Sequence, residues 1–556
     1  MRRDERILLL GDMCYKEVFN KVVIDLKAKF ENKNTYHLEY TIRIFDYLDN
    51  SVHQEILKNT EYTLVCICIA QSLTKISVEN ALSNIEKLIE IYSGKGIKVI
   101  LGTIPLKGNW KKYKSYNKRI MELATKKNLF VADFNTFFSY YKKDLPDISG
   151  NVINAAGISI MCSLLKSMIM HSKLLVLWQY NGRYAHCNYA CPYCYVATSV
   201  NKGMHFQFDI STWEKAFERH FGSKETIFYF SYGEPLMGGN LFYEILEMIG
   251  QHPNWEVRMT SNVSVNLERL LNTTLARTKR LNINASFHPT QTHVENFIEK
   301  CNEIRRAGIE PSIVYVMYPE QIDDFENKYL PVFNSLGYRV HIRAFRGLYK
   351  GKKYPQAYNN AQWEKTAKYM DMGNFRYQLN AINGLGRVSF LGVSHILVDN
   401  YGKIEMCDSY VGDRHYGNVF DEKINLDIAP QPFPGLVPLA AVDDIADYYE
   451  IGYDELTENN INNYIEQGGV YKSKNSIIYP LENVNFKDKH LKKELLKVPS
   501  PQVSRWRFWL NPKWFAKHFI YSYVIKKYGK YILAWIRGKL RLMKAGKLRK
   551  ENFWHG

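Results

Sequence analysis

Short apolar runs separated by polar, helix-like stretches make up the first part of the chain. Residues 112–127 are typical of the polar stretches, with apolar positions at helical spacing. The apolar runs that alternate with them are ILLLGDM (7–13), YTLVCICIA (62–70), IKVILGTIP (97–105) and LFVADF (129–134). Such an alternation predicts a parallel α/β sheet. We therefore expect an α/β domain over residues 1–170.

The same alternation restarts near residue 172 and continues toward residue 350. The apolar runs of this segment are KLLVLWQY (173–180), TIFYFSYG (226–233), WEVRMTSN (255–262), RLNINASFHP (280–289), PSIVYVMYP (311–319) and YRVHIRAFRG (338–347). Each run is followed by a stretch with helical spacing, which makes six βα units. They predict an open or partial (β/α)6 barrel over residues 172–350, with functional residues at the carboxyl ends of its strands.

The chain beyond residue 350 carries weaker signals. The segment HILVDNYGKIEMCDSY (395–410) predicts a hairpin, with Asn400, Tyr401 and Gly402 in its turn. We treat residues 351–500 as an accessory region and assign no elements to its polar part from 420 to 500. With 556 residues and 46% hydrophobic side chains, the chain is long enough for two or three domains with separate cores.

The net charge of +18 is concentrated near the end of the sequence, in residues 501–556. Fourteen Lys and Arg residues, and no Asp or Glu, lie between residues 505 and 550. On a helical projection the apolar side chains share one face: Tyr521, Val524, Ile525, Tyr528, Ile532, Trp535, Ile536 and Met543. The opposite face carries the cations Lys526, Lys530, Arg537, Arg541 and Lys544. This segregation predicts a basic amphipathic helix that lies on an anionic membrane surface.

Two other interpretations of this tail stay open. It is compatible with an ordinary packed helix, and its interleaved cations and aromatics also suit single-stranded nucleic acid, which we disfavour because the apolar residues are segregated rather than scattered. Elsewhere the sequence shows neither the apolar core of a signal peptide nor a run of ~18 apolar residues. We expect a cytoplasmic protein, peripheral at the inner face of the membrane.

Three of the chain's nine cysteines lie within eight positions, in HCNYACPYCY (186–195). Clustered cysteines in a reducing compartment indicate metal or redox chemistry. A structural zinc site needs four ligands, usually as two separated pairs. His186 adjoins Cys187 and would have difficulty reaching the same metal ion. Cys187, Cys191 and Cys194 instead suit a 4Fe-4S cluster with one iron left open.

The C-x3-C-x2-C spacing, its place after the first barrel strand and the aromatic Tyr193 resemble the radical S-adenosylmethionine (SAM) superfamily. The resemblance implies that Cys187, Cys191 and Cys194 bind the cluster, while the open iron chelates SAM. An electron from the cluster then cleaves SAM to a 5′-deoxyadenosyl radical, which abstracts hydrogen from a substrate. A reductant such as flavodoxin or ferredoxin is the implied partner.

The second barrel strand ends in FSYGEP, where Gly233, Glu234 and Pro235 resemble the GGEP segment of the same superfamily. The backbone carbonyls of that segment accept hydrogen bonds from the ammonium group of SAM. Tyr232 stands in place of the first glycine. We expect Glu234 to act through its position more than through its charge.

Further candidates close the later strands of the barrel. By the same resemblance, polar groups there face the carboxylate and ribose of SAM, and the apolar fifth strand, with Val316, holds the adenine. The polar candidates are Thr260, Ser261 and Asn262 after the third strand, Ser286 and His288 after the fourth, and Arg343 and Arg346 after the sixth. Simpler roles are helix caps for Thr260 or Ser286, a turn for His288 and surface charges for the arginines.

The segment around Cys407 is similar to the start of an accessory domain that binds extra iron–sulfur clusters in many radical SAM enzymes. Such a domain needs several cysteines, whereas this chain has one there and none beyond it. We therefore expect no auxiliary cluster and interpret Cys407 as a small buried hydrophobe.

Residues 1–170 resemble the SGNH (GDSL-type) hydrolases, which implies a three-layer α/β/α fold. Gly11 and Asp12 match the opening block. Three further segments follow in the expected order: IKVILGTIPL, YNKRIMELATKKNLFVADF and DLPDISGNVINAAG. Met13 stands at the serine position and Gly150 at the histidine position, so the nucleophile and its base are both missing. We expect a noncatalytic module that binds glycan or acyl groups, with a flavodoxin-like domain as the alternative.

Together these features predict a radical SAM enzyme with one 4Fe-4S cluster. Its expected substrate is a cell-surface polysaccharide or a lipid-linked sugar precursor, which would suit both the SGNH-like module and the basic tail. Two alternatives stay open: a radical SAM maturase that modifies a peptide, and a noncatalytic membrane or nucleic-acid adaptor with a structural cluster.

Overall fold

Two parallel sheets and the helices that cover them account for most of the computed structural model. It describes residues 4–11, 15–30, 37–44, 62–68, 77–105, 111–141, 155–170, 172–180, 187–194, 206, 208–231, 233–345, 347–354, 357–369, 388–405 and 416–432. Several predictions fall outside these residues, namely those on Asp12, Met13, Gly150, His186, Tyr232, Arg346, Cys407 and the tail 501–556.

Within the described residues, five parallel strands form the first sheet in the order β2-β1-β3-β4-β5. They are β1 (Asp4–Gly11), β2 (His37–Ile44), β3 (Leu64–Cys68), β4 (Lys98–Gly102) and β5 (Phe130–Ala132). β1, β3, β4 and β5 coincide with the predicted apolar runs. β2 does not, because its sequence HLEYTIRI mixes charged and apolar residues, as suits a strand at the edge of a sheet.

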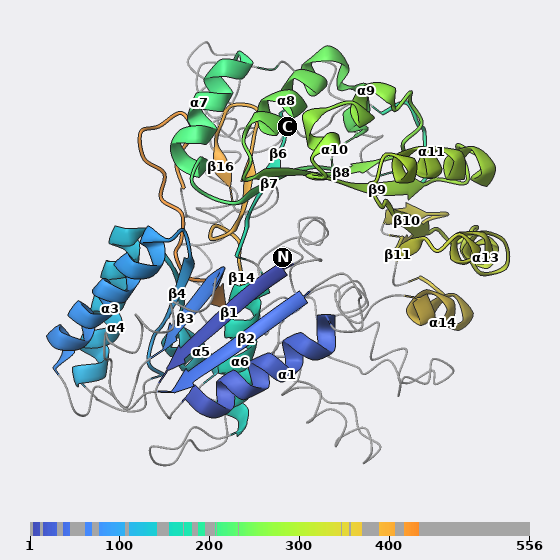
Figure 1. Ribbon diagram of the computed structural model, residues 1–556. Coiled ribbons are helices and arrows are strands. Elements are labelled where there is room, and N and C mark those ends of the chain that lie inside the picture. Colours follow the sequence, from blue (N-terminus) through green and yellow to red (C-terminus); the bar gives the residue numbers. More distant parts are fainter. Residues whose placement is uncertain are drawn as a thin grey trace, which may run out of the picture. The chain divides into compact units, whose positions relative to one another are not determined.

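Helices cover both faces of this sheet, as the predicted three-layer arrangement requires (Figure 1). The helices are α1 (Lys16–Phe30), α3 (Val78–Gly94), α4 (Lys111–Lys127), α5 (Phe134–Tyr141) and α6 (Ala155–Met170). In β1, Ile7 and Leu9 pack with α1, α5 and α6, whereas Leu8 and Leu10 pack with α3 and α4. The continuous apolar run of β1 therefore follows from burial on both faces.

The second sheet contains the six strands predicted for the barrel, which lie side by side in chain order and run parallel. They are β6 (Leu174–Trp178), β7 (Thr226–Phe230), β8 (Trp255–Ser261), β9 (Leu281–Phe287), β10 (Ser312–Met317) and β11 (Arg339–Ala344). The helices between them are α7 (Ile210–Phe221), the 3-10 helix η3 (Pro235–Gly238), α8 (Gly239–Gln251), α9 (Glu268–Leu271), α10 (Thr274–Arg277), α11 (Val294–Arg306), α12 (Ile322–Asp324), the π-helix η4 (Phe325–Tyr329) and α13 (Leu330–Ser335).

The two faces of this sheet differ in chemistry. On the helix-covered face, aromatic side chains pack together; Phe228, for example, contacts Phe217 of α7 at 5.1 Å between ring centroids. The strands alternate accordingly, so that Val257 and Met259 of β8 are buried while Arg258 between them is partly exposed. Because paired residues of parallel strands share a face, the other side carries the polar groups of β8 and β9, such as Arg258, Thr260 and Asn284, and is called the polar face here. Toward β6 and β15 the same side carries a small apolar cluster of Leu177, Tyr229 and Leu397.

The predicted hairpin is present and extends the barrel sheet. β15 (His395–Val398) pairs with β16 (Ile404–Glu405) in antiparallel orientation, and the turn contains Gly402 at φ +81°. β15 also pairs in parallel with β6, so the sheet runs β11-β10-β9-β8-β7-β6-β15-β16. The remaining described elements are β12 (Gly347–Tyr349), β13 (Lys352–Tyr354), α14 (Asn360–Tyr369), β14 (Val388–Ser389) and β17 (Gln431–Pro432).

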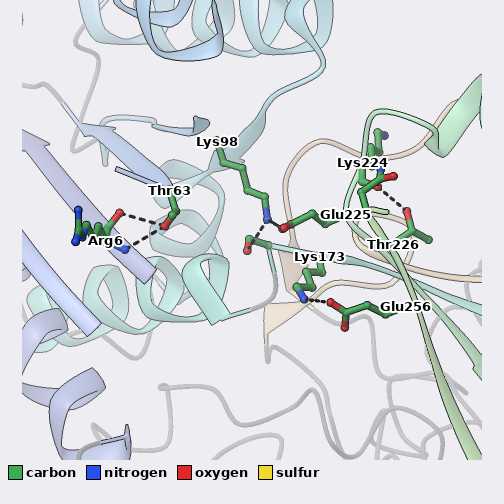
Figure 2. A network of polar contacts seen from close by, with 10 residues as sticks. Arg6, Thr63, Lys98, Lys173, Lys224, Glu225, Thr226 and Glu256 are labelled. Atoms are coloured by element: carbon green, nitrogen blue, oxygen red, sulfur yellow. Dashed lines mark hydrogen bonds and ion pairs between the residues drawn. The ribbon is translucent and has the colours of Figure 1, made fainter. Parts of the chain in front are cut away.

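Polar contacts connect the amino ends of strands from the two sheets. Lys98, the first residue of β4, forms an ion pair with Glu225, which directly precedes β7 (Figure 2). The ammonium group of Lys98 also donates to Ser172 Oγ at 3.5 Å. Nearby, Lys173 pairs with Glu256 at 2.6 Å.

None of the helices in the described residues is both long and apolar enough to span a membrane.

Candidate functional site

The three clustered cysteines lie in a loop that follows β6, at the carboxyl edge of the barrel sheet. Cys187 is exposed, Cys191 is buried and Cys194 is half-buried. The backbone N–H of Cys194 donates to the carbonyl oxygen of Cys191 at 3.0 Å, which makes a tight turn around Pro192. The last two cysteines therefore lie at the two ends of one tight turn.

The three thiols are close neighbours. Burial, together with the nearby thiols of Cys194 and Cys187, raises the pKa of Cys191 to about 12. Burial raises the pKa of Cys187, and the backbone N–H of Tyr189, which donates to Cys187 Sγ at 3.4 Å, opposes that rise. Thiols grouped in this way, with N–H donors aimed at sulfur, fit an iron–sulfur cluster.

The described residues include no group of three His, Cys, Asp or Glu side chains arranged around one metal ion. A single ion such as zinc would need ligands that converge on one point. In a 4Fe-4S cluster each cysteine binds a different iron, so the three sulfurs need not converge on one point.

The cysteine loop is tied to the loops that follow β8 and β9. Asn188 donates its amide to Ser264 Oγ at 2.8 Å, and the backbone N–H of Ala190 donates to Gln291 Oε1 at 3.0 Å. None of these residues is a candidate on sequence grounds. The position of Asn188 between two cysteines is the only signal that points to it, whereas Ser264 and Gln291 become partners through the fold alone.

Tyr193 and His288, both predicted site residues, contact each other. Their hydroxyl oxygen and Nδ1 lie 3.0 Å apart, and their rings stack at 5.7 Å. Tyr189 and Tyr318 complete the aromatic group, at 6.0 Å from His288 and 5.0 Å from Tyr193 respectively. Burial lowers the pKa of His288 to about 4, so its imidazole is neutral near pH 7.

The Glu234 carboxylate holds the ends of β7 and β8 together. It is 2% exposed and accepts hydrogen bonds from Ser261 Oγ at 2.7 Å, from the Asn262 N–H at 2.6 Å and from the Leu236 N–H at 3.1 Å. Burial raises the pKa of this carboxyl group, and the three described donors oppose that rise. Both oxygens are therefore engaged within the protein.

The residues on either side of Glu234 set the path of the backbone. Gly233 adopts φ +62°, a left-handed conformation in which a side chain would be strained. Pro235 is the first residue of η3, where its fixed φ is compatible with a helix start. The Gly-Glu-Pro sequence thus makes a sharp turn at the edge of the sheet.

The three polar residues that close β8 have different surroundings. Thr260 Oγ1 lies 3.0 Å from the hydroxyl of Tyr229, on the polar face of the sheet. The hydroxyl of Ser261 is engaged by Glu234. Asn262 alone of the three reaches the cysteine loop: its Nδ2 lies 3.0 Å from Asn188 Oδ1 and 3.7 Å from Cys187 Sγ.

The remaining candidates lie on the polar face of the next strands. Ser286 of β9 is 8% exposed and pairs in register with Val314 of β10. Val316, two residues further along β10, is half-buried and pairs with Arg343 of β11. The predicted residues therefore lie along one sheet edge, from β6 to β11.

A comparison with protein families identifies the domain that contains this sheet edge. Residues 183–329 match the family model described as "Radical SAM superfamily". The chain contains a radical SAM domain. It is therefore an enzyme, and the family to which this domain belongs uses a 4Fe-4S cluster and SAM. The matched segment includes the cysteine loop, the Gly-Glu-Pro turn and the ends of β8 to β10.

Solved structures similar to the chain include two proteins whose structures contain SAM and a third, TesA. Native anSMEcpe with bound AdoMet and Cp18Cys peptide is 16% identical, with 45% of this chain and 78% of that chain covered and a TM-score of 0.34. Streptococcus suis SuiB bound to S-adenosylmethionine is 14% identical, with 56% and 75% covered and a TM-score of 0.34. TesA is 16% identical, with 30% and 97% covered and a TM-score of 0.24. No curated protein matches the chain.

The lowered pKa of His288 predicts how the stability of the radical SAM domain depends on pH. Between pH 6.5 and about 4 the unfolded chain binds a proton at this imidazole and the folded chain does not, so stability falls as the pH falls. Across this window we expect the free energy of unfolding to fall by about 1–3 kcal/mol more in the wild type than in His288→Asn. Urea unfolding at several pH values measures the difference. Equal losses of unfolding free energy in the two proteins would contradict the prediction.

Proposed function

We propose that Cys187, Cys191 and Cys194 hold a 4Fe-4S cluster whose open iron binds SAM. The observation that carries the proposal is the grouping of the three thiols beside the Gly-Glu-Pro turn, at the carboxyl edge of a parallel sheet. When bound, the cluster supplies an electron for reductive cleavage of SAM to methionine and a 5′-deoxyadenosyl radical, which takes hydrogen from the substrate. A flavodoxin or ferredoxin would supply the electron.

The residues of the sheet edge would bind and orient SAM. Backbone carbonyls of Gly233 to Pro235 would accept the ammonium group, and Tyr193 and Val316 would contact the adenosine. Thr260, Ser286 and His288 are the candidates for the ribose and the carboxylate. Because Glu234 and Ser261 are engaged with each other, their part is to position this edge rather than to contact SAM.

The cysteine assignment predicts a selective loss of the cluster. After anaerobic reconstitution, Cys187→Ala should lose the paramagnetic signal of the reduced cluster and lower the yield of 5′-deoxyadenosine by at least about 100-fold, because one iron loses its ligand. Cys301→Ala is the matched control, since Cys301 is buried within α11 and belongs to no candidate site. A variant at Cys187 that still forms 5′-deoxyadenosine at the wild-type rate would contradict the assignment.

We also propose that residues 1–170 form an SGNH-like module without catalytic activity. The sheet order β2-β1-β3-β4-β5 and the three layers are compatible with it. The same strand order occurs in flavodoxin-like domains, so Gly11-Asp12 and the three later sequence segments carry the SGNH-like assignment, while Met13 and Gly150 carry the expected lack of activity. Residues 351–500 would be an accessory region without an auxiliary cluster.

For the substrate we propose a cell-surface polysaccharide or a lipid-linked sugar precursor. The support is contextual: a module of glycan- or acyl-binding type precedes the radical SAM domain, and a basic, aromatic tail follows it. Modification of a peptide is the rival function.

One assay separates these functions. With dithionite and SAM, reconstituted protein should form 5′-deoxyadenosine at least about tenfold faster when a lipid-linked oligosaccharide extract is added, because radical SAM enzymes commit SAM cleavage to bound substrate. Stimulation by peptides alone would establish the maturase instead. Iron binding without SAM cleavage under any condition would contradict the proposed reaction.

We propose that the tail, residues 505–550, binds the inner face of the membrane and that the protein is otherwise cytoplasmic. The support is its charge: fourteen cations and no acidic residue, with apolar residues on one helical face. Each cation near an anionic leaflet contributes roughly 1 kcal/mol.

Truncation tests the membrane proposal. The full chain should float with vesicles that contain phosphatidylserine, whereas a chain ending at residue 500 should stay in the soluble fraction because it lacks the cations. Vesicles of phosphatidylcholine alone are the control, and we expect at least about tenfold weaker recovery with them. Equal flotation of both chains would refute the proposal.

A further inference from the structure

We propose that Asn262 donates a hydrogen bond from its side chain to the cluster ligand Cys187 and thereby raises the reduction potential of the cluster. The inference rests on the proposed cysteine assignment and goes beyond it, because it gives one residue a redox role separate from SAM binding. The contact that carries it is the distance of 3.7 Å between Asn262 Nδ2 and Cys187 Sγ.

The orientation of the Asn262 amide is determined by its other partners. Oδ1 accepts hydrogen bonds from the backbone N–H of Ser264 at 3.1 Å and from its hydroxyl at 2.7 Å. A flipped amide would point its NH2 group at a backbone N–H, which cannot accept. The NH2 group therefore faces the cysteine loop, where Asn188 Oδ1 lies 3.0 Å away and Cys187 Sγ takes the second hydrogen.

Asn188 closes this arrangement into a ring of hydrogen bonds. Its Oδ1 accepts from Asn262, and its NH2 group donates to Ser264 Oγ at 2.8 Å. Each of the three side chains is thus bonded to the other two. The donor on Asn262 is held by the loop that carries Cys187 as well as by its own turn.

The backbone at Asn262 is equally constrained. Its N–H donates to Glu234 Oε2 at 2.6 Å, and the N–H of the next residue, Val263, donates to Ser261 Oγ at 3.0 Å. Val263 is buried and has φ +48°, a left-handed conformation that is strained for a β-branched residue. Such strain persists only where surrounding contacts impose it, and here the hydrogen bonds to Glu234 and Ser261 are those contacts.

The sulfur that the Asn262 amide contacts determines its expected effect on the reduction potential. Cys187 is the exposed member of the three thiols and also accepts the N–H of Tyr189 at 3.4 Å. Hydrogen bonds to a ligand sulfur withdraw electron density and stabilise the more negative, reduced cluster. A fixed amide at this sulfur would therefore make the cluster easier to reduce.

The test compares Asn262→Leu and Asn262→Asp with the wild type after anaerobic reconstitution of the full chain. Asn262→Leu removes the donor at similar volume. At the midpoint potential of the wild type, we expect the ratio of reduced to oxidised cluster to fall about tenfold, which corresponds to a midpoint lower by about 59 mV for one electron. Asn262→Asp places a negative charge near sulfur and should lower the midpoint further. Redox titration followed by electron paramagnetic resonance measures the shift without any need for turnover.

Controls separate this inference from the function on which it rests. Asn302→Leu removes a side-chain amide from α11 whose oxygen accepts from Tyr338 at 2.6 Å, and it should leave the midpoint unchanged. Wild-type protein that forms no cluster would overturn the proposed function itself. A cluster with an unshifted midpoint in Asn262→Leu would overturn only the role of Asn262.

A second variant covers the case in which Asn262→Leu fails to assemble the cluster. Ser264→Ala leaves the amide in place but removes the hydroxyl that bonds Oδ1, so the donor is less well oriented. We expect the midpoint to shift in the same direction but by less. At the midpoint potential of the wild type, the ratio of reduced to oxidised cluster should fall about threefold. An unchanged midpoint in Ser264→Ala, together with loss of the cluster in Asn262→Leu, would reduce Asn262 to a structural residue.

Discussion

Parallel strands that follow one another in chain order bring their carboxyl ends to one edge, and this constraint places the whole candidate site. From β6 to β11 each strand pairs with the next one along the chain. The cysteine loop after β6, the Gly-Glu-Pro turn after β7 and the polar residues at the ends of β8 and β9 must therefore lie side by side. Aromatic side chains pack on the helix-covered face, and the opposite face carries polar groups on β8 and β9.

At this edge, burial and hydrogen bonding act against each other on one carboxylate. Hydrogen bonds to a charged group contribute about 1.5–3 kcal/mol each, and Glu234 accepts three described ones. Removing a carboxylate from water costs several kcal/mol, and the raised pKa of Glu234 indicates that burial outweighs the donors. The strained turn at Val263 adds to that cost. The hydrogen bonds that Glu234 accepts hold the ends of β7 and β8 in one arrangement.

The first sheet shows how far topology alone constrains function. Its order, β2-β1-β3-β4-β5, and its two helical layers are shared by unrelated α/β domains. The proposed SGNH-like assignment depends instead on sequence segments such as Gly11-Asp12, and Met13 and Gly150, which replace the expected serine and histidine, bear only on whether the module is catalytic. The ion pair of Lys98 with Glu225 lies at the opposite, amino ends of the strands.

The sequence by itself determined the strands of both sheets except β2, the hairpin at residues 395–405 and the cysteine trio, because these depend on local periodicity and spacing. Only the tertiary structure decided which polar groups meet. The ring of Asn188, Asn262 and Ser264 joins residues about 75 positions apart, and the neutral state of His288 follows from burial by distant aromatic rings. The pairing of β15 with β6 is equally non-local. Such contacts depend on how strands are ordered in space, which no pattern within a single segment encodes.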